Sequence, residues 1–155
     1  MGRGYVGAPD LVHALACRGV QVTALALPLL FALAGDARFT LASTRTGARY
    51  TYRVRASEDG AVFFVSTLTG ADNEHDYTFT GTIFDRSRYV HSRRSRIGAD
   101  APSVTAFTWG WARGLAHPLL EVYHEGRCGR CARTLTVPES VATGFGPECR
   151  GKVAL

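Results

Sequence analysis

Lysine is almost absent from this sequence. Of its 18 basic residues only Lys152 is a lysine, so arginine supplies nearly all of the positive charge behind the net charge of +5. Guanidinium groups bind phosphate in a bidentate manner and stack on bases, which favours an anionic partner such as nucleic acid. A GC-rich genome enriches arginine and alanine codons together, and it explains the same bias without any selection for phosphate binding.

Several catalytic signatures are also missing. The chain has no H-E-x-x-H, no Walker loop and no G-x-S-x-G, and its cysteines do not lie in the H-x-E and P-C-x-x-C setting of nucleobase deaminases. No βαβ pattern surrounds the C-x2-C pair, which argues against a redox pair of the thioredoxin type. We therefore predict that the protein is not an enzyme.

The chain also lacks an apolar run long enough to span a membrane. Residues 20–34 are nearly all apolar, but the stretch is short and contains Pro28. We interpret residues 1–34 as an N-terminal helical segment, and we expect a cytoplasmic protein without membrane contact. Two alternatives stay open for this segment, a secretory leader and a start codon assigned too early.

Downstream, alternating apolar and polar residues predict an α+β fold. Four strands joined by short turns indicate an antiparallel meander. Flanking helices and a C-terminal zinc knuckle module complete the expected architecture. We expect a meander-plus-helix domain over 35–118 and a zinc module over 119–155. The predicted strands are 39–43, 49–55, 61–68 and 77–84, and the predicted helices are 9–18, 28–34 and 103–116.

The most informative motif is H-x3-C-x2-C-x17-C near the C-terminus. Neutral histidine and cysteine thiolates are the donors of structural Zn²⁺ sites, and Gly129 permits a tight turn between the first two cysteines. The predicted ligands are His124, Cys128, Cys131 and Cys149. His124 is the least secure of them: Glu148 and His117 are weak substitutes, and a solvent-facing histidine is the plain alternative. His75 lies among Asp72, Glu74 and Asp76, where a solvated turn is favoured over a cation site.

Residues 122–150 resemble a small uncharacterised zinc-binding domain family of bacterial and phage proteins. The resemblance rests on Tyr-His-Glu-Gly-Arg-Cys-Gly-Arg-Cys and on Gly-Phe-Gly-Pro-Glu-Cys149. Upstream segments such as Arg49–Arg55 and Ser95–Val104 are similar to regions often joined to that module. The resemblance implies zinc at the three cysteines and His124, and it implies no activity.

Arginines cluster in three places that together suggest a nucleic-acid-binding surface. Flexible basic segments with interleaved aromatic residues suit phosphate contact and base stacking. We predict a zinc-stabilised accessory protein that binds DNA or RNA. The alternative is a phage or mobile-element module that inhibits or adapts a host protein complex. That alternative predicts a mixed or acidic patch on the protein surface. The candidate nucleic-acid contacts are Arg49, Arg53, Arg55, Arg86, Arg88, Tyr89, Arg93, Arg94, Arg96, Arg127 and Arg130.

Overall fold

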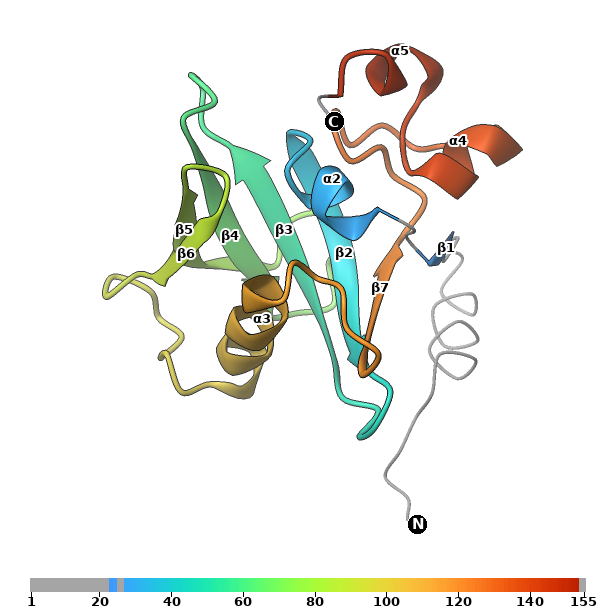
Figure 1. Cartoon of the computed structure of the whole chain (residues 1–155). Helices are drawn as coiled ribbons and strands as arrows, with labels where there is room; N and C mark the ends of the chain where they lie inside the picture. Colours follow the sequence, from blue (N-terminus) through green and yellow to red (C-terminus); the bar gives the residue numbers. More distant parts are fainter. Residues whose placement is uncertain (1–22, 25–26, 154–155) are drawn as a thin grey trace.

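The computed structural model describes residues 23–24 and 27–153 of the chain. Their central element is one antiparallel sheet with the strand order β1-β7-β2-β3-β4-β5-β6 (Figure 1). The edge strand β1 has only two residues, so the sheet consists in substance of the other six strands. The strands are β1 (Thr23–Ala24), β2 (Asp36–Ser43), β3 (Arg49–Ala56), β4 (Val62–Leu68), β5 (Tyr77–Phe84), β6 (Arg88–His91) and β7 (Leu120–His124).

The predicted meander is present as strands β2 to β5. Each of these strands pairs with the next one along the chain, and their bounds lie within three residues of the predicted ones. Gly47 and Gly60 adopt positive φ angles of 76° and 74° in the two tight turns. Glycine takes this conformation without steric cost, so the turn signals in the sequence were sufficient to locate the hairpins.

The sheet nevertheless extends beyond four strands. Strand β6 pairs with β5 within residues 86–100, where the sequence predicts a loop with a short edge strand near Tyr89 as the alternative, and β7 pairs with β2 and β1. Because β7 belongs to residues 119–155, the metal-binding region is joined to the sheet by a continuous ladder of backbone hydrogen bonds. Such pairing between segments about 80 residues apart leaves no local signal in the sequence.

The described helices are short, and each has a proline in its first turn. Proline suits this position because the first helical N–H groups have no partner within the helix. Helix α3 ends four residues earlier than expected, where Gly114 takes a φ of 65°. The predicted helix 9–18 lies outside the described residues, and no described helix is long and apolar enough to cross a membrane. The helices are α2 (Pro28–Ala32), α3 (Pro102–Ala112), α4 (Pro138–Thr143) and α5 (Pro147–Arg150).

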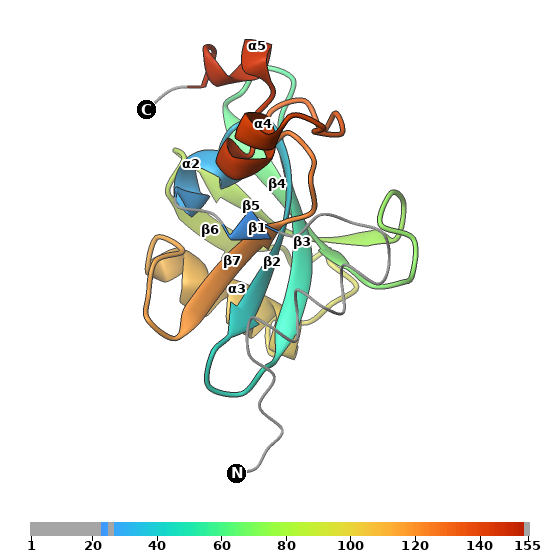
Figure 2. The ribbon, with the colours of Figure 1, turned by 90° about the vertical axis from the view of Figure 1, so that its right-hand side faces the viewer.

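Helix α3 covers one face of the sheet, hereafter the inner face (Figures 1 and 2). The Phe107 ring lies 5.0 Å from that of Tyr52, 4.8 Å from that of Tyr89 and 5.6 Å from that of Trp111. The Tyr52 hydroxyl donates a 2.6 Å hydrogen bond to the Ser103 carbonyl, and burial raises the pKa of Tyr52. Aromatic packing and one buried hydrogen bond therefore hold the helix to the sheet.

The same core continues into the metal-binding region through α2. The Phe31 ring lies 5.5 Å from the His124 ring and 5.7 Å from the Phe145 ring. Cys128, Leu135 and Cys149 belong to the same buried cluster. Helix α2, the sheet and the cysteine region thus share one hydrophobic core across both predicted boundaries, 34/35 and 118/119.

Candidate functional site

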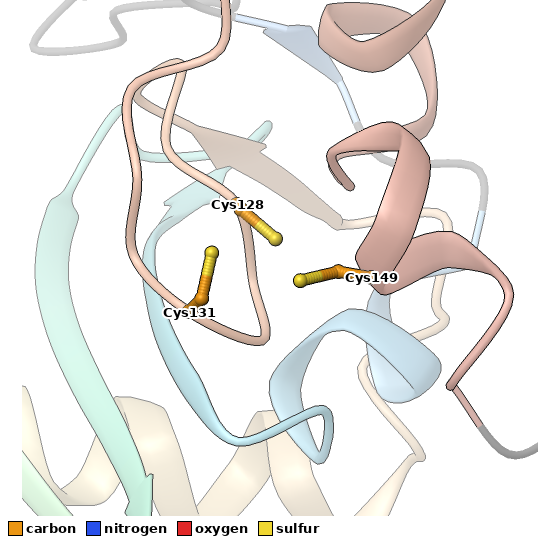
Figure 3. Close-up of side chains that lie close together, drawn as sticks. All are labelled: Cys128, Cys131 and Cys149. Atoms are coloured by element: carbon orange, nitrogen blue, oxygen red, sulfur yellow. The ribbon is translucent and has the colours of Figure 1, made fainter.

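Three cysteine sulfurs lie together at one end of the sheet. The Sγ atoms of Cys128, Cys131 and Cys149 are all within 4.8 Å of one another, and the side chains point toward a common centre (Figure 3). Sulfurs that share one tetrahedral zinc ion, with Zn–S bonds of about 2.3 Å, are separated by roughly 3.8 Å. The three residues can therefore hold a metal ion with only small adjustments.

A tight turn brings the first two cysteines together. The Cys128 amide donates to the Arg133 carbonyl and the Ala132 amide donates to the Cys128 carbonyl, both at 2.8 Å. Ala132, with φ of 64°, takes the left-handed conformation in this turn. Gly129 is needed for a different reason from the one we expected, since a Cβ atom there would lie 2.7 Å from the Phe31 ring.

A second turn delivers Cys149 on helix α5. Gly144 ends α4 with a φ of 83°, and its carbonyl accepts a 2.9 Å hydrogen bond from the Gly129 amide. Gly146 then precedes Pro147 at the start of α5. The glycine-bearing turn predicted from the sequence is confirmed, and its hydrogen bond to Gly129 fixes the separation of the two turns.

The surroundings of the sulfurs favour thiolate at Cys128. Burial acts to raise the pKa of this thiol, but hydrogen bonds from the backbone of Gly146, Cys131 and Arg130 outweigh burial and lower the pKa. The Arg130 guanidinium also lies 3.8 Å from the Cys149 Sγ. Backbone donors and a nearby cation are the usual means of stabilising metal-binding thiolates.

The structure does not bring His124 to the three sulfurs. Its ring is fully buried beneath Phe31, and both ring nitrogens have backbone partners. Nδ1 accepts a 3.0 Å hydrogen bond from the Gly126 amide, and Nε2 lies 2.7 Å from the Val141 carbonyl, to which it must donate. Burial lowers the pKa of His124, so the ring is neutral. Here His124 ties β7 to the turn after it and to α4, and its ring lies outside the group formed by the three sulfurs.

The two weaker substitutes for the fourth ligand are placed differently. Glu148 lines the same hollow of about 450 Å³ as the three cysteines. His117 instead packs its ring 4.9 Å from that of Trp109 and accepts a hydrogen bond from the Leu119 amide. Within residues 23–24 and 27–153, no other histidine, cysteine or carboxylate joins the cysteine group. The donor set is thus three sulfurs that face a hollow with one acidic residue in its lining.

Comparison with known proteins agrees with the location of this module. Residues 119–154 match the profile of a family of unknown function, DUF6011. No curated protein and no solved structure matches the chain. The match covers β7, the turn that carries Cys128 and Cys131, and helices α4 and α5. It therefore encloses all three cysteines and leaves the rest of the sheet outside it.

The acidic loop around His75, for which the sequence favours a solvated turn over a cation site, is internally bonded. Asp72 contacts the His75 ring at 2.9 Å, and a carboxylate oxygen of Asp76 accepts a hydrogen bond from the Asp72 amide. Glu74 forms ion pairs with Arg127 and Arg38. These contacts use the carboxylates to hold residues 69–76 against the sheet, so the loop has the character of a structured turn.

Several of the predicted nucleic-acid contacts are engaged within the protein. Arg53 makes two hydrogen bonds to Asp36 at 2.9 and 3.0 Å, and Arg127 pairs with Glu74. Arg86 donates to the Leu33 carbonyl and lies over the Phe63 ring. Tyr89 packs against Phe107 on the inner face, so its ring is not available to stack on a base.

The other predicted arginines are exposed, and several of them gather at the outer face of the sheet, opposite α3. Arg55 lines a shallow depression with Phe64, and Arg94 and Arg96 line another with Phe79. Arg88 lies over the Phe84 ring at 4.9 Å. Sequence reasoning missed these phenylalanines because the same strands carry buried apolar residues, Phe63 on β4 and Ile83 on β5, so apolar character alone did not separate the two faces. The exposed members of the predicted set are Arg49, Arg55, Arg86, Arg88, Arg93, Arg94, Arg96 and Arg130.

Proposed function

We propose that this chain is a zinc-stabilised accessory protein that binds nucleic acid through arginines on the outer face of its sheet. The observation that carries the proposal is the group formed by Arg55, Arg94 and Arg96, which are exposed beside two exposed phenylalanine rings. Arginines placed in this way supply phosphate contacts, and their binding is driven by counterion release.

The carboxylates around this face do not cancel its charge. Asp36 is held by Arg53 and Glu74 by Arg127, so both are already paired with cations of the protein. The remaining exposed guanidinium groups keep their charge available for a ligand. The alternative of a host-protein adaptor predicts a mixed or acidic patch around Asp72, Glu74 and Asp76 and no salt-sensitive binding of DNA, so the binding assay below separates the two proposals.

Zinc is the metal that we propose for the cysteine cluster. Thiolate donors select zinc or other soft ions over magnesium and calcium, and the C-x2-C turn is a common zinc-binding element. The three cysteines would hold the ion, and Glu148 is the described carboxylate that lines the hollow and can approach it. In this proposal the ion organises the module, and the arginine surface makes the contact with nucleic acid.

The test combines metal analysis with a binding assay on the same purified protein. We expect about one zinc per chain and binding of labelled DNA and RNA that weakens as salt is raised. A triple variant, Arg93→Gln, Arg94→Gln and Arg96→Gln, is expected to bind more weakly and to flatten the logarithmic salt dependence by about two units for a single strand.

A matched control removes the same charge elsewhere. The triple variant Arg45→Gln, Arg113→Gln and Arg150→Gln leaves the outer face of the sheet intact and is expected to retain most of the affinity. Equal losses in the two triple variants would mean that only the net charge matters. No binding of DNA or RNA by the zinc-loaded protein would overturn the proposal and favour a protein partner.

A further inference from the structure

Two phenylalanines form an exposed aromatic pair on the outer face of the sheet. Phe64 on β4 and Phe79 on β5 are 39% and 37% exposed, and their ring centroids lie 6.3 Å apart. Val90 on β6 is 40% exposed on the same face, separated from Phe64 by Thr82 of β5, and the three apolar residues are hereafter called the strip. Contiguous exposed apolar groups on an otherwise charged surface mark a contact site more often than isolated ones do.

A β-bulge in β5 creates this pair. Phe64 lies opposite Thr82 and Ser66 lies opposite Phe79, whereas Thr80 has no partner in the ladder. The Thr80 side chain is buried, and its hydroxyl donates to the Val65 carbonyl. Without the extra residue, regular alternation would put Phe79 on the same face as the buried Ile83. The bulge therefore turns Phe79 to the outer face, which is a frequent role of bulges at functional surfaces.

Arginines flank the aromatic pair on both sides. Arg55 lies directly opposite Phe64 on the neighbouring strand β3. On the other side, the Ser95 hydroxyl donates a 2.7 Å hydrogen bond to the Phe79 carbonyl, and the Ser92 amide donates to the Thr80 carbonyl. These two bonds fasten the segment that carries Arg94 and Arg96 against the bulge, beside Phe79.

We infer that this face binds single-stranded nucleic acid by stacking bases on Phe64 and Phe79, with phosphates held by Arg55, Arg94 and Arg96. The inference rests on the proposed function and specifies the form of its ligand. Charge complementarity selects a polyanion, and exposed rings require free base faces, which a duplex hides within its own stack. Open antiparallel sheets with exposed aromatic residues bind single strands in this manner in other proteins.

The test compares a labelled single strand with a hairpin duplex of equal charge, using the zinc-loaded full chain. The variants are Phe64→Leu and Phe79→Leu, which keep an apolar side chain and remove the aromatic ring. Each is expected to weaken binding of the single strand by about 5- to 100-fold, the range expected when one stacked base loses its aromatic partner. Binding of the duplex is expected to stay nearly unchanged.

Two further variants separate stacking from other effects. Phe64→Trp is expected to retain the single-strand affinity that Phe64→Leu loses, because tryptophan keeps an aromatic face at this position. Leu119→Ala truncates a similarly exposed apolar residue outside the strip, since Leu119 is 38% exposed, and it is expected to change neither affinity.

The outcomes distinguish the inference from the proposed function. If the leucine variants bind the single strand as tightly as the unmodified chain does, base stacking on these rings is overturned. Weaker binding by the triple arginine variant would still support nucleic-acid binding. If the unmodified, zinc-loaded chain binds neither the single strand nor the duplex, both proposals fail. A dimer of the unmodified chain that dissociates in Phe64→Leu, with unchanged oligonucleotide affinity, would instead assign the strip to a second copy of this chain.

Discussion

The half of the molecule around α3 and the module around the cysteines are held together by different means. Between the sheet and α3, large side chains such as Tyr52, Phe63 and Phe107 are almost fully buried. Over residues 125–153, the buried apolar side chains apart from the two buried cysteines are Leu135 and Phe145. A region with so little apolar surface needs another source of stability, and in the proposed function an ion held by the three cysteines supplies it.

The two regions are nevertheless not independent. Phe31 packs against His124 and Phe145, and the Asp36 amide donates to the Gly129 carbonyl at 2.9 Å. Helix α2 therefore lies between the sheet and the module and contacts both. The comparison shows that a module with little apolar surface is attached to the apolar core through β7 and through helix α2. Each prediction below perturbs one part of that arrangement.

The largest effect is expected from Cys128→Ser. Binding of structural zinc contributes about 10–16 kcal/mol in small zinc-finger peptides, so loss of this ligand removes most of the stability of the module. Hydrogen exchange is expected to accelerate over residues 125–153 and α2, while β3 to β5 stay protected. Metal content should fall, and chelation of the unmodified chain should give the same exchange pattern.

Two controls define this result. Ala142→Ser introduces a serine at an exposed position of the same module and should keep both metal and protection. Phe107→Ala acts on the other region: it is expected to cost about 3–5 kcal/mol of unfolding free energy and to leave the metal content unchanged. Full metal content and unchanged protection in Cys128→Ser would refute the assignment of the site.

A smaller effect is expected from His124→Gln. The variant should keep its zinc, because the histidine has backbone partners on both ring nitrogens, and it should lose about 1–3 kcal/mol from the disturbed hydrogen bonds. Metal analysis and denaturant unfolding measure the two quantities. Loss of zinc from this variant, with Ser140→Ala retaining it, would restore His124 as a ligand.

The same residue predicts a pH dependence. Burial holds the pKa of His124 below its ordinary value of 6.5, so the unfolded chain binds this proton more readily than the folded protein does. The stability contributed by the neutral ring is present above pH 6.5 and is lost as the pH falls toward the folded-state pKa. Stability of the unmodified chain and of His124→Gln should therefore converge on acidification, as followed by urea unfolding at several pH values.

An effect no larger than that of His124→Gln is expected at the contact between the two regions. In Gly129→Ala the new Cβ would lie 2.7 Å from the Phe31 ring, so the ring must move, at a cost of about 1–3 kcal/mol. Gly146→Ala is the matched control, because a Cβ there has no atom within 4 Å. Thermal unfolding midpoints compare the two variants. Equal midpoints would contradict the prediction, because they would show that the Phe31 ring can move without a cost in stability.

The sequence by itself determined the hairpins and the cysteine cluster. Alternating side chains and glycines with positive φ define β2 to β5 locally, because strand periodicity and turn chemistry act over a few residues. The C-x2-C turn and the glycine-bearing turn before Cys149 are local features of the same kind. Three cysteines at these spacings were sufficient to predict that their sulfurs lie close enough together to hold a metal ion, although not where the His124 ring is placed.

The tertiary structure alone decided how these parts are combined. Pairing of β7 with β2, packing of Phe31 under the knuckle, and the bulge that exposes Phe79 all depend on contacts between segments distant in the chain. His124 illustrates the reason: an imidazole can bind a metal or donate and accept hydrogen bonds, and only the backbone groups folded around it select between these roles. Local patterns specify the elements, whereas the burial of each side chain is a property of the assembled core.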